Sequence, residues 1–496
     1  MRHSILFLTL AWASALCGTA QTGLSPRAFG LDTASTGEAR YHVLYQAHLA
    51  ALRQHREVDY GGIGDLDIDV PGDGQPIPLS GNTDFHGITI TVGNNAKDIT
   101  LFALQGDAVE TDVPQGLIDS GDFRGVPGLA TGERLLLITD TKPWTERTGY
   151  GYYHYRRDIL SLRDGLAENR VVMPYADTAT SKAKCVAVRA DGETRAIRNV
   201  TLRRKAGATH KTYLLLVSRM SHVLIENVTL VTPHDPEKYG DGALTVNDCA
   251  HITVRNLLVD GSYSQPHQYG YGIAMNNVWH CRFVRATSRN CAWGVFGANN
   301  VSDITLEDCD LNRFDIHCYG RNVTLRRCLF RDQRVQYSSV FGNILYDNCT
   351  FRHCVPLYIR PSYNAHVPFD ITMRRCTFEA TAVRGRVSLL DMGALSPEGN
   401  PRPELSERCW PNVTIEDLTV RLGFGARRVY LFRIEGGQRD TTPLSYCSRI
   451  SIDGLRFAGP IRELKMCNRN GITFRHKPSL SITRAEGVRV INNLVR

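Results

Sequence analysis

The chain has 496 residues and a formal net charge of +8; 42% of its residues are hydrophobic and 22% are charged. This composition is that of a soluble globular protein. Beyond the N-terminal segment, no stretch approaches the roughly 18 uninterrupted apolar residues of a membrane-spanning helix, so we expect no membrane span. The basic residues are scattered and no nucleic-acid motif is present. We therefore expect no nucleic acid partner and favour an acidic polysaccharide.

The N-terminus, residues 1–20, has the three-part layout of a secretory signal peptide. Arg2 precedes an apolar run from Ile5 to Trp12, and small residues follow as far as Ala20. We expect cleavage after Ala20 and a secreted or periplasmic protein. Cys17 leaves a lipoprotein open as an alternative, although the residue before it is a poor match for such a signal.

Residues 21–80 are expected to form an N-terminal cap region. A helix is predicted at 36–55, with Thr36 as its N-cap, and it would cover the open end of a repeat protein. A strand follows in which aspartates alternate with apolar residues. This alternation indicates a solvent-facing edge and leaves a calcium site open as an alternative for Asp65, Asp67, Asp69 and Asp73. Otherwise we expect no cofactor and no metal site, since the chain contains no CxxC pair.

A short sequence motif of alternating apolar and polar residues recurs from about residue 199 onward. Each copy covers about six positions, as a half-buried strand does. Counting degenerate copies at 281 and 344, the period is about 20 to 30 residues, which is typical of solenoids. The copies begin at Asn199, His222, His251, Asp303, Asn322, Asp370, Asn412 and Arg449.

This period predicts an all-β protein in which residues 81–496 form one parallel β-helix. A single strand cannot bury its apolar face alone, whereas stacked coils form a continuous interior. A leucine-rich repeat is disfavoured because helical periodicity is absent. Two loop excursions are expected, at 142–157 and 395–410. The first is dense in Tyr and Arg, so it is either a sugar-binding loop or an ordinary loop packed on the solenoid.

Six cysteines sit at or near one register of the repeats, and we interpret them as small buried residues. They are Cys249, Cys281, Cys309, Cys328, Cys349 and Cys376. The Asn-Val-Thr triplets match the glycosylation sequon, but they recur because the repeat recurs, so they do not indicate modification.

A second aligned set of segments lies between the repeats. Asp241, Tyr271 and Trp293 each precede a glycine, so we expect a tight turn there and these side chains side by side on successive coils. Neighbouring coils add further polar side chains to the same groove. The residues predicted to bind substrate are Asp241, Lys238, Trp293, Asn277, Arg334, Arg360 and Tyr363.

Segment 313–319 carries the sharpest chemical pattern. Alternation puts its polar side chains on one outward face, which indicates either a catalytic strand or a structural Asp–His pair. In β-elimination, Arg313 or Arg360 would neutralise a uronate carboxylate, His317 would be the base, and a tyrosine the acid. The predicted catalytic residues are His317, Tyr319, Arg313, Asp315 and Tyr271. Hydrolysis would instead need two carboxylates, for which Asp241 and Asp315 are the candidates.

Over roughly residues 80–460 the repeats resemble the pectate-lyase-like superfamily of right-handed parallel β-helices. Segments 269–277 and 314–320 are similar to those of secreted Bacteroidota proteins, some of which resemble glycosaminoglycan (chondroitin-type) lyases. The superfamily hosts lyases, hydrolases, epimerases and phage adhesins. Its hydrolases carry adjacent Asp pairs and a Gly-His-Gly segment, which this chain lacks. The resemblance thus implies the fold more strongly than the activity. From segment 313–319 and the net positive charge we expect a polysaccharide lyase acting on an acidic polysaccharide, with a β-helix hydrolase or a tailspike-like adhesin as alternatives.

Overall fold

The computed structural model describes most of the chain from residue 23 onward. The described residues are 23–147, 152–172, 181–187, 194–208, 210, 212–233, 243–261, 271–291, 293–297, 300–317, 319–331, 334–360, 369–393, 410–434, 447–469, 476 and 478–494. The predicted signal peptide and, apart from Trp410, the predicted loop at 395–410 lie outside them. Among these residues, no helix combines the length and apolar content needed to cross a membrane.

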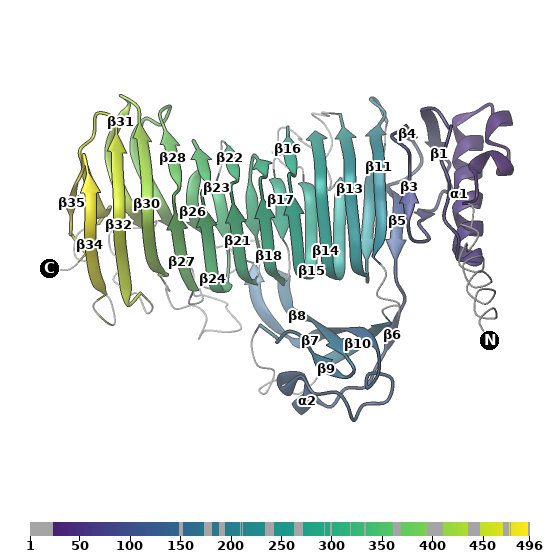
Figure 1. Ribbon diagram of the computed structural model, residues 1–496, viewed down its shortest axis with the longest axis horizontal. Helices are drawn as coiled ribbons and strands as arrows, with labels where there is room; N and C mark the ends of the chain where they lie inside the picture. The colour runs from purple at the N-terminus through teal and green to yellow at the C-terminus, as the bar shows by residue number, and fades with distance from the viewer. Residues whose placement is uncertain are drawn as a thin grey trace, which may run out of the picture.

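The fold is a parallel β-solenoid, as the repeats predict (Figure 1). The right-handed winding implied by the resemblance stays a prediction. In the described residues the parallel strands stack in three columns, which we call faces A, B and C in the order in which each coil visits them. Each strand pairs with its counterpart on the neighbouring coils, so that apolar side chains at equivalent positions form one continuous core.

Face A carries β2 (Ile77–Pro78), β5 (Ile99–Gln105), β12 (Thr212–Ser218), β17 (Trp293–Gly297), β20 (Phe314–Ile316), β23 (Arg334–Tyr337), β26 (Val355–Ile359), β29 (Gly385–Met392), β31 (Ala426–Ile434), β33 (Glu463–Cys467) and β35 (Arg489–Ile491). Face B carries β3 (Thr83–Asp84), β18 (Val301–Glu307), β21 (Gly320–Arg326), β24 (Val340–Asp347) and β27 (Phe369–Arg374).

Face C carries β1 (Leu66–Val70), β4 (Thr89–Asn94), β16 (Thr287–Arg289), β19 (Asp310–Leu311), β22 (Leu329–Arg331), β25 (Thr350–Arg352) and β28 (Thr377–Ala380). Longer strands bend around corners and contribute to two or three faces. These are β11 (Arg195–Arg204), β13 (Ser221–Thr232), β14 (Leu244–Gly261), β15 (Tyr271–Val284), β30 (Asn412–Leu422), β32 (Arg449–Ala458) and β34 (Ser479–Glu486).

The corner between faces B and C is a ladder of left-handed residues. Asn199, Asn227 and Asn256 have φ angles of 56°, 55° and 52°, which Asn tolerates better than most residues. The Nδ2 atom of Asn227 donates to Oδ1 of Asn199 at 2.9 Å, and Nδ2 of Asn256 donates to Oδ1 of Asn227 at 2.7 Å. The repeat that begins at Asn199 therefore aligns with Asn227 on the next coil. The sequence suggested an alignment with His222, five residues earlier. The error arose because the strand segments before and after this corner have similar sequences.

Four of the six cysteines occupy one buried column, just after this corner: Cys309, Cys328, Cys349 and Cys376. Cys249 pairs with Val278 and Cys281 pairs with Ile252, so these two belong to other columns, and the single register predicted for all six is wrong for them. All six thiols are buried and none forms a disulfide, which confirms their role as small core residues.

The N-terminal cap is α1 (Gly37–Gln54), which packs against β1 and β2 at one end of the solenoid (Figure 1). The Thr36 hydroxyl accepts a hydrogen bond from the Ala39 amide at 3.1 Å, so the predicted N-cap is confirmed. Two short 3-10 helices, Pro26–Phe29 and Leu31–Thr33, precede it. In β1, Ile68 is buried while its aspartate neighbours face solvent, as the alternation predicted.

An antiparallel sheet interrupts the solenoid between β5 and β11, and we call it the small sheet. It comprises β6 (Ala108–Glu110), β7 (Glu133–Arg147), β8 (Tyr152–Arg163), β9 (Leu166–Ala167) and β10 (Ser181–Ala187), with α2 (Gln115–Ser120) beside it. In Figure 1 the small sheet lies below the coils of β14 to β18. It has its own apolar core, which includes Phe123, Leu136 and Leu160. The prediction of a β-helix over 81–496 with a loop excursion at 142–157 is therefore wrong here: the excursion is a sheet, and residues 142–157, where described, lie in β7 and β8.

The small sheet docks on the corner between faces A and B. Leu135, Leu137 and Ile159 pack against Ala250 and Trp279 of the solenoid. This apolar contact helps to hold the small sheet at that corner.

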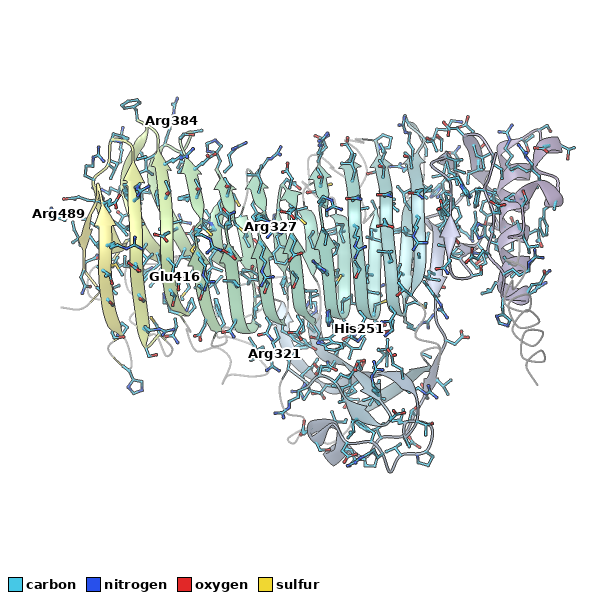
Figure 2. The ribbon with its side chains drawn as sticks, in the orientation of Figure 1. His251, Arg321, Arg327, Arg384, Glu416 and Arg489 are labelled. Atoms are coloured by element: carbon cyan, nitrogen blue, oxygen red, sulfur yellow. The ribbon has the colours of Figure 1, made fainter. Side chains whose placement is uncertain are left out.

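On the outer surface of the solenoid, ion pairs connect neighbouring coils. Arg282 and Arg326 both contact the Glu307 carboxylate, at 2.5 and 3.5 Å, and Arg327 contacts Asp308 at 2.7 Å. Figure 2 shows Arg327 on this outer surface. Because these arginines already face carboxylates, the net charge of +8 is not concentrated in this part of the surface.

Candidate functional site

The candidate site is a row of polar side chains along face A. Strand pairing places Asp315, Gln336, Tyr358, Asp391 and Arg433 at the same level of five successive coils. Within β20 the apolar neighbours of Asp315 point into the core, so the alternation predicted from the sequence is confirmed there. The row is thus a direct consequence of the two-residue strand period and the coil-to-coil register.

Asp315 is the centre of the site. Its Oδ2 atom lies 2.9 Å from Nη2 of Arg313, 2.8 Å from Nε2 of His317, 2.5 Å from Nε2 of Gln336 and 4.0 Å from Nη1 of Arg360. Arg360 also contacts the His317 ring and lies 3.4 Å from its Nδ1 atom. The structure therefore brings together Arg313, Asp315, His317 and Arg360 as predicted, and adds Gln336 from the coil between them.

The cluster is largely withdrawn from solvent. Asp315 is 0% exposed and His317 4%, whereas the side chains of Arg313 and Arg360 keep 14% and 18% of their exposure. The two guanidinium groups therefore form the outer layer of the cluster, and the acid–histidine pair lies beneath them.

Burial and charge set the protonation states of the pair. Burial raises the pKa of Asp315, but its partners His317, Arg313 and Arg360 outweigh burial and hold that pKa below its ordinary value. Burial lowers the pKa of His317 to about 4; the Asp315 carboxylate opposes this shift, and the charges of Arg360 and Arg313 add to it. Near neutral pH the site thus holds an ionised carboxylate, a neutral imidazole and cationic guanidinium groups.

This arrangement can bind an anion and remove a proton. A neutral His317 that donates its Nε2–H to Asp315 keeps a lone pair on Nδ1, and the carboxylate holds the ring in that tautomer. The guanidinium groups above it suit the planar carboxylate of an acidic sugar.

The row continues beyond the residues that the sequence singled out. Nη2 of Arg433 donates to Oδ2 of Asp391 at 2.9 Å, and the guanidinium of Arg334 lies 4.3 Å from the ring centre of Tyr358. Arg334, a predicted substrate-binding residue, is exposed at the start of β23, two positions before Gln336. Asp391 and Arg433 were missed because they lie outside the aligned segments. The signal was present in the apolar alternation of β29 and β31, whose inward residues fix the register.

Tyr319 does not belong to the cluster, which corrects its predicted role as an acid. It is 1% exposed, and its hydroxyl accepts a hydrogen bond from the amide of Arg157 in β8 and donates one to the carbonyl of the same residue. β20 ends at Ile316, and Tyr319 lies three residues beyond that end, so the strand period does not determine where Tyr319 points. Tyr319 instead anchors the small sheet to the solenoid.

Of the predicted set of Asp241, Tyr271 and Trp293, only the register of Tyr271 with Trp293 can be checked, and it is as predicted; strand parity does not place Tyr271 on the face of Asp315. Tyr271 pairs with Trp293, but it has the parity of the inward Ile273, whereas the neighbouring Ala274 is at the level of Asp315. The glycines that follow, Gly272 and Gly294, lie in extended strands without positive φ. Close packing accounts for Gly294, since an added Cβ would lie 2.4 Å from the Ser288 hydroxyl. The expected tight turns are therefore absent at these two glycines.

Asn277 is a structural residue and not a substrate ligand. It has a φ of 54°, is 1% exposed, donates to Asp248 at 2.8 Å and accepts from Asn300 at 3.2 Å. It thus forms a corner ladder between faces A and B. Three predicted substrate-binding residues, Asp241, Lys238 and Tyr363, lie outside the described residues, and of Trp293 only the backbone is described.

Comparison with protein-family models gives no match, and comparison with the sequences of curated proteins gives none either. Among solved structures, the chain is similar to the tailspike protein gp49 from Pseudomonas phage LKA1, with 15% identity, 91% of this chain and 82% of that chain covered, and a TM-score of 0.43. It is also similar to the Gp54 tailspike of Acinetobacter baumannii bacteriophage AP22, determined in complex with A. baumannii capsular saccharide (9% identity, 90% and 77% covered, TM-score 0.48).

A third similar structure is the catalytic unit of a thermostable GH87 alpha-1,3-glucanase from Streptomyces thermodiastaticus strain HF3-3, with 11% identity, 77% and 94% covered, and a TM-score of 0.29. All three TM-scores lie below 0.5, so the functional argument for this chain rests on its own site.

Proposed function

We propose that the protein is a secreted polysaccharide lyase that cleaves a uronate-containing, glycosaminoglycan-like polysaccharide by β-elimination. One observation carries this proposal: the Asp315–His317 pair, hydrogen-bonded at 2.8 Å, lies directly beneath the guanidinium groups of Arg313 and Arg360. A base that is held in one tautomer and covered by cations is what abstraction of a proton next to a carboxylate requires.

In this mechanism the substrate carboxylate takes the place of His317 as the partner of Arg360. Arg360 contacts both ring nitrogens of His317 and limits access to Nδ1 in the free protein. A bidentate pair with a uronate carboxylate would draw the guanidinium outward and expose that nitrogen. Binding of an acidic sugar would thus uncover the base, which accounts for the low exposure of His317.

The elimination itself balances with one residue as base and acid. His317 takes the C5 proton, the C5–H electron pair becomes the C4=C5 double bond, and the C4–O bond breaks. The leaving oxygen receives the proton from the imidazolium formed in the first step. Arg313 and Arg360 stabilise the negative charge that develops on the carboxylate before the C4–O bond breaks.

The small sheet is joined to the coil that carries the site. Tyr319 ties Arg157 of β8 to the coil that carries β20, and two exposed tyrosines of the same strand, Tyr153 and Tyr155, lie just before Arg157. Exposed aromatic rings next to cationic side chains suit a chain of sugar rings. These tyrosines support the sugar-binding interpretation of the 142–157 segment.

The test is to incubate the protein with chondroitin sulfate, hyaluronan, alginate and polygalacturonate and to follow the ultraviolet absorbance of the unsaturated product. Growth of this absorbance with at least one polymer, lost in His317→Gln, supports the lyase. New reducing ends without absorbance would refute elimination and favour the hydrolase alternative, in which Asp315 would act with Asp241. Within the described residues, Asp391 cannot be the second carboxylate, because three strand spacings of about 4.8 Å place it about 14 Å from Asp315, beyond the reach of a glycosidase pair.

One observation favours a second candidate, a non-catalytic binder of acidic polysaccharide. The complete burial of Asp315 is also what a structural ion cluster would show, with Arg313, Arg334 and Arg360 holding the ligand. Saturable binding of an acidic polymer, with no new ends of any kind, would support the binder and exclude both enzymes.

A further inference from the structure

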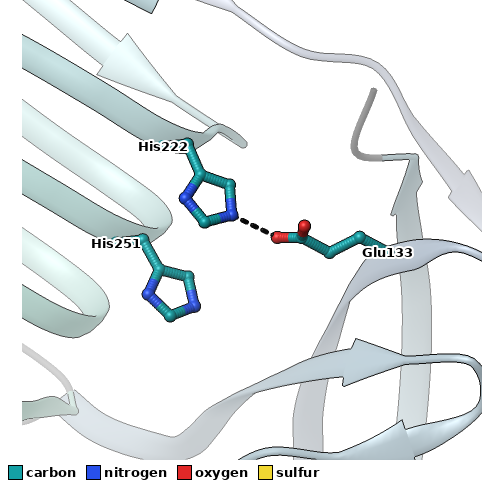
Figure 3. Close-up of side chains that lie close together, drawn as sticks. All are labelled: Glu133, His222 and His251. Carbon is teal, nitrogen blue, oxygen red and sulfur yellow. Dashed lines mark hydrogen bonds and ion pairs between the residues drawn. The ribbon is translucent and has the colours of Figure 1, made fainter. Parts of the chain in front are cut away.

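Two histidines occupy the same position on consecutive coils, where face B begins. His222 and His251 have φ angles of 55° and 53°, and their rings stack with centroids 4.7 Å apart and planes 5° apart. Both rings project toward the small sheet (Figure 3), and Figure 2 shows His251 at that edge of the solenoid. Equivalent backbone conformations on neighbouring strands are what hold the two imidazoles parallel.

A carboxylate from the small sheet meets these rings. Oε1 of Glu133, at the start of β7, lies 2.5 Å from Nε2 of His222 (Figure 3). One ligand atom from each of Glu133, His222 and His251 lies within 4.8 Å of the others. A second carboxylate is close by, since Oε2 of Glu168 is 3.6 Å from Nε2 of His251.

We propose that Glu133, His222 and His251 bind one divalent transition-metal ion, with Zn²⁺ as the natural probe, and that this ion fastens the small sheet to the solenoid. Two imidazoles and a carboxylate are a ligand set that Zn²⁺ accepts in a tetrahedral site, with Glu168 or water in the fourth position. Two of the ligands come from the solenoid and one from the small sheet, so a bound ion joins the two parts.

The geometry requires only a modest rearrangement. A tetrahedral ion about 2.1 Å from each ligand atom places neighbouring ligand atoms about 3.4 Å apart. The widest pair, at most 4.8 Å apart, must therefore close by no more than about 1.4 Å, and the Glu133–His222 pair at 2.5 Å must open by about 0.9 Å. Rotation of the Glu133 and His251 side chains can supply both changes. The backbone positions already converge, since the apolar contact of Leu135 and Leu137 with the solenoid holds β7 in place.

Polar groups surround the proposed ligands. Nearby polar groups orient the second carboxylate: Ser161 donates to Oε2 of Glu168 at 2.8 Å and Arg163 donates to Oε1 at 3.0 Å. Such outer contacts typically strengthen metal sites.

The main alternative is an ordinary ion pair between Glu133 and His222 beside a stack of rings. An ion pair needs one histidine, whereas a metal site uses both His222 and His251 and does not use the next histidine along, His280. His280 is exposed, its ring centre lies 5.0 Å from that of His251 with the ring planes tilted by 46°, and it lies outside the three-residue group. It therefore offers a matched control at the same type of backbone position.

The test uses the full-length protein, freed of metal with a chelator and titrated with Zn²⁺ by calorimetry. We expect one equivalent to bind, a rise in the thermal midpoint with Zn²⁺, and, on substitution of Co²⁺, visible absorption bands of tetrahedral coordination. His222→Asn, His251→Asn and Glu133→Gln should each weaken binding by about 100-fold or more, because each removes a ligand. Asn is chosen because it tolerates the positive φ at both positions.

His280→Asn should bind Zn²⁺ within about 3-fold of the unsubstituted protein, because it leaves the ligand set of imidazole and carboxylate atoms unchanged. The proposal is wrong if the unsubstituted protein shows no saturable binding at one equivalent. It is also wrong if folded His222→Asn and His251→Asn, checked by circular dichroism, bind as tightly as the control. Neither outcome depends on whether the protein cleaves a polysaccharide.

Discussion

The phenolic hydroxyl of Tyr319 bonds to both the amide and the carbonyl of Arg157, a residue 162 positions earlier in the chain. This contact joins the coil that carries the candidate site to the small sheet. It gives Tyr319 an anchoring role and removes it from the proton transfers of the proposed reaction.

Replacement of Tyr319 by Phe should therefore lower stability and spare turnover. The change removes the hydroxyl partner of a part-buried amide and carbonyl of Arg157, and an unsatisfied buried group typically costs about 1 to 3 kcal/mol, so we expect a loss at the lower end of that range. Urea unfolding measures the loss, and lyase assays should show kcat within about 3-fold of the parent protein. A fall in kcat of about 100-fold at unchanged stability would instead restore Tyr319 as the acid.

Replacement of His317 by Gln should lower kcat by about 100-fold or more, because the proposed base is removed. Circular dichroism should show an intact fold, since Gln retains polar atoms near Asp315 and Gln336. Asp315→Asn should destabilise the protein as well, by about 3 to 5 kcal/mol, because the buried cations Arg313 and Arg360 lose their counter-charge. Near-normal turnover of folded His317→Gln would contradict the assigned base.

The acidic limb of the pH profile of kcat/KM should lie at an unusually low pH. A base acts while it is neutral, and burial lowers the pKa of His317 to about 4. As the pH falls from neutral, kcat/KM should therefore hold through the range where an ordinary histidine protonates and fall only as the pH approaches about 4. A pH profile of kcat/KM in the free protein checks this, and an acidic limb near the ordinary histidine pKa of about 6.5 would argue against His317.

Replacement of Arg360 by Gln should lower kcat/KM on acidic polymers by about 100-fold, because one of the cations that neutralise the uronate is lost. Arg327→Gln is the matched control: Arg327 is also an arginine of the coil surface, but it is paired with Asp308 outside the site. The control should stay within about 2-fold in kcat/KM, since a surface ion pair contributes little. Equal losses in both variants would indicate a general charge effect and not a specific site.

Asn227 tests the corner ladder. Asn227→Ala places a Cβ-bearing residue without a compensating side chain at a φ of 55° and removes the bonds to Asn199 and Asn256. Asn227→Gly removes the same bonds but accepts the left-handed conformation. Urea unfolding should show the Ala variant less stable than the Gly variant by about 1 to 2 kcal/mol. Equal stabilities would show that backbone strain does not decide this position.

Part of the site was accessible from the sequence because it lies within one strand. The two-residue period predicts that Arg313, Asp315 and His317 share one face, and the contacts of Asp315 with both neighbours show that the three side chains converge. The prediction failed for Tyr319 because β20 ends before it, and for Tyr271 because equal spacing before a glycine does not determine the face. Gln336 and Arg360 converge on Asp315 only because the register of β23 and β26 brings their coils together.

The three proposed metal ligands also differ in whether the sequence could have revealed them. His222 and His251 open two consecutive copies of the repeat, so their stacking could have been predicted from the sequence. Glu133 could not, because it reaches them from the small sheet, about 90 positions earlier, through an apolar contact that no local pattern encodes.

The sequence by itself determined the parallel solenoid, the N-terminal cap and the outward Arg–Asp–His strand, because these follow from local periodicity and capping. Only the tertiary structure decided that the solenoid is interrupted by a small antiparallel sheet, that Tyr319 serves this junction, and that Asp315 is buried under two guanidinium groups. These features depend on which coils and sheets pack against one another, and packing is set by side-chain contacts between residues far apart in the chain.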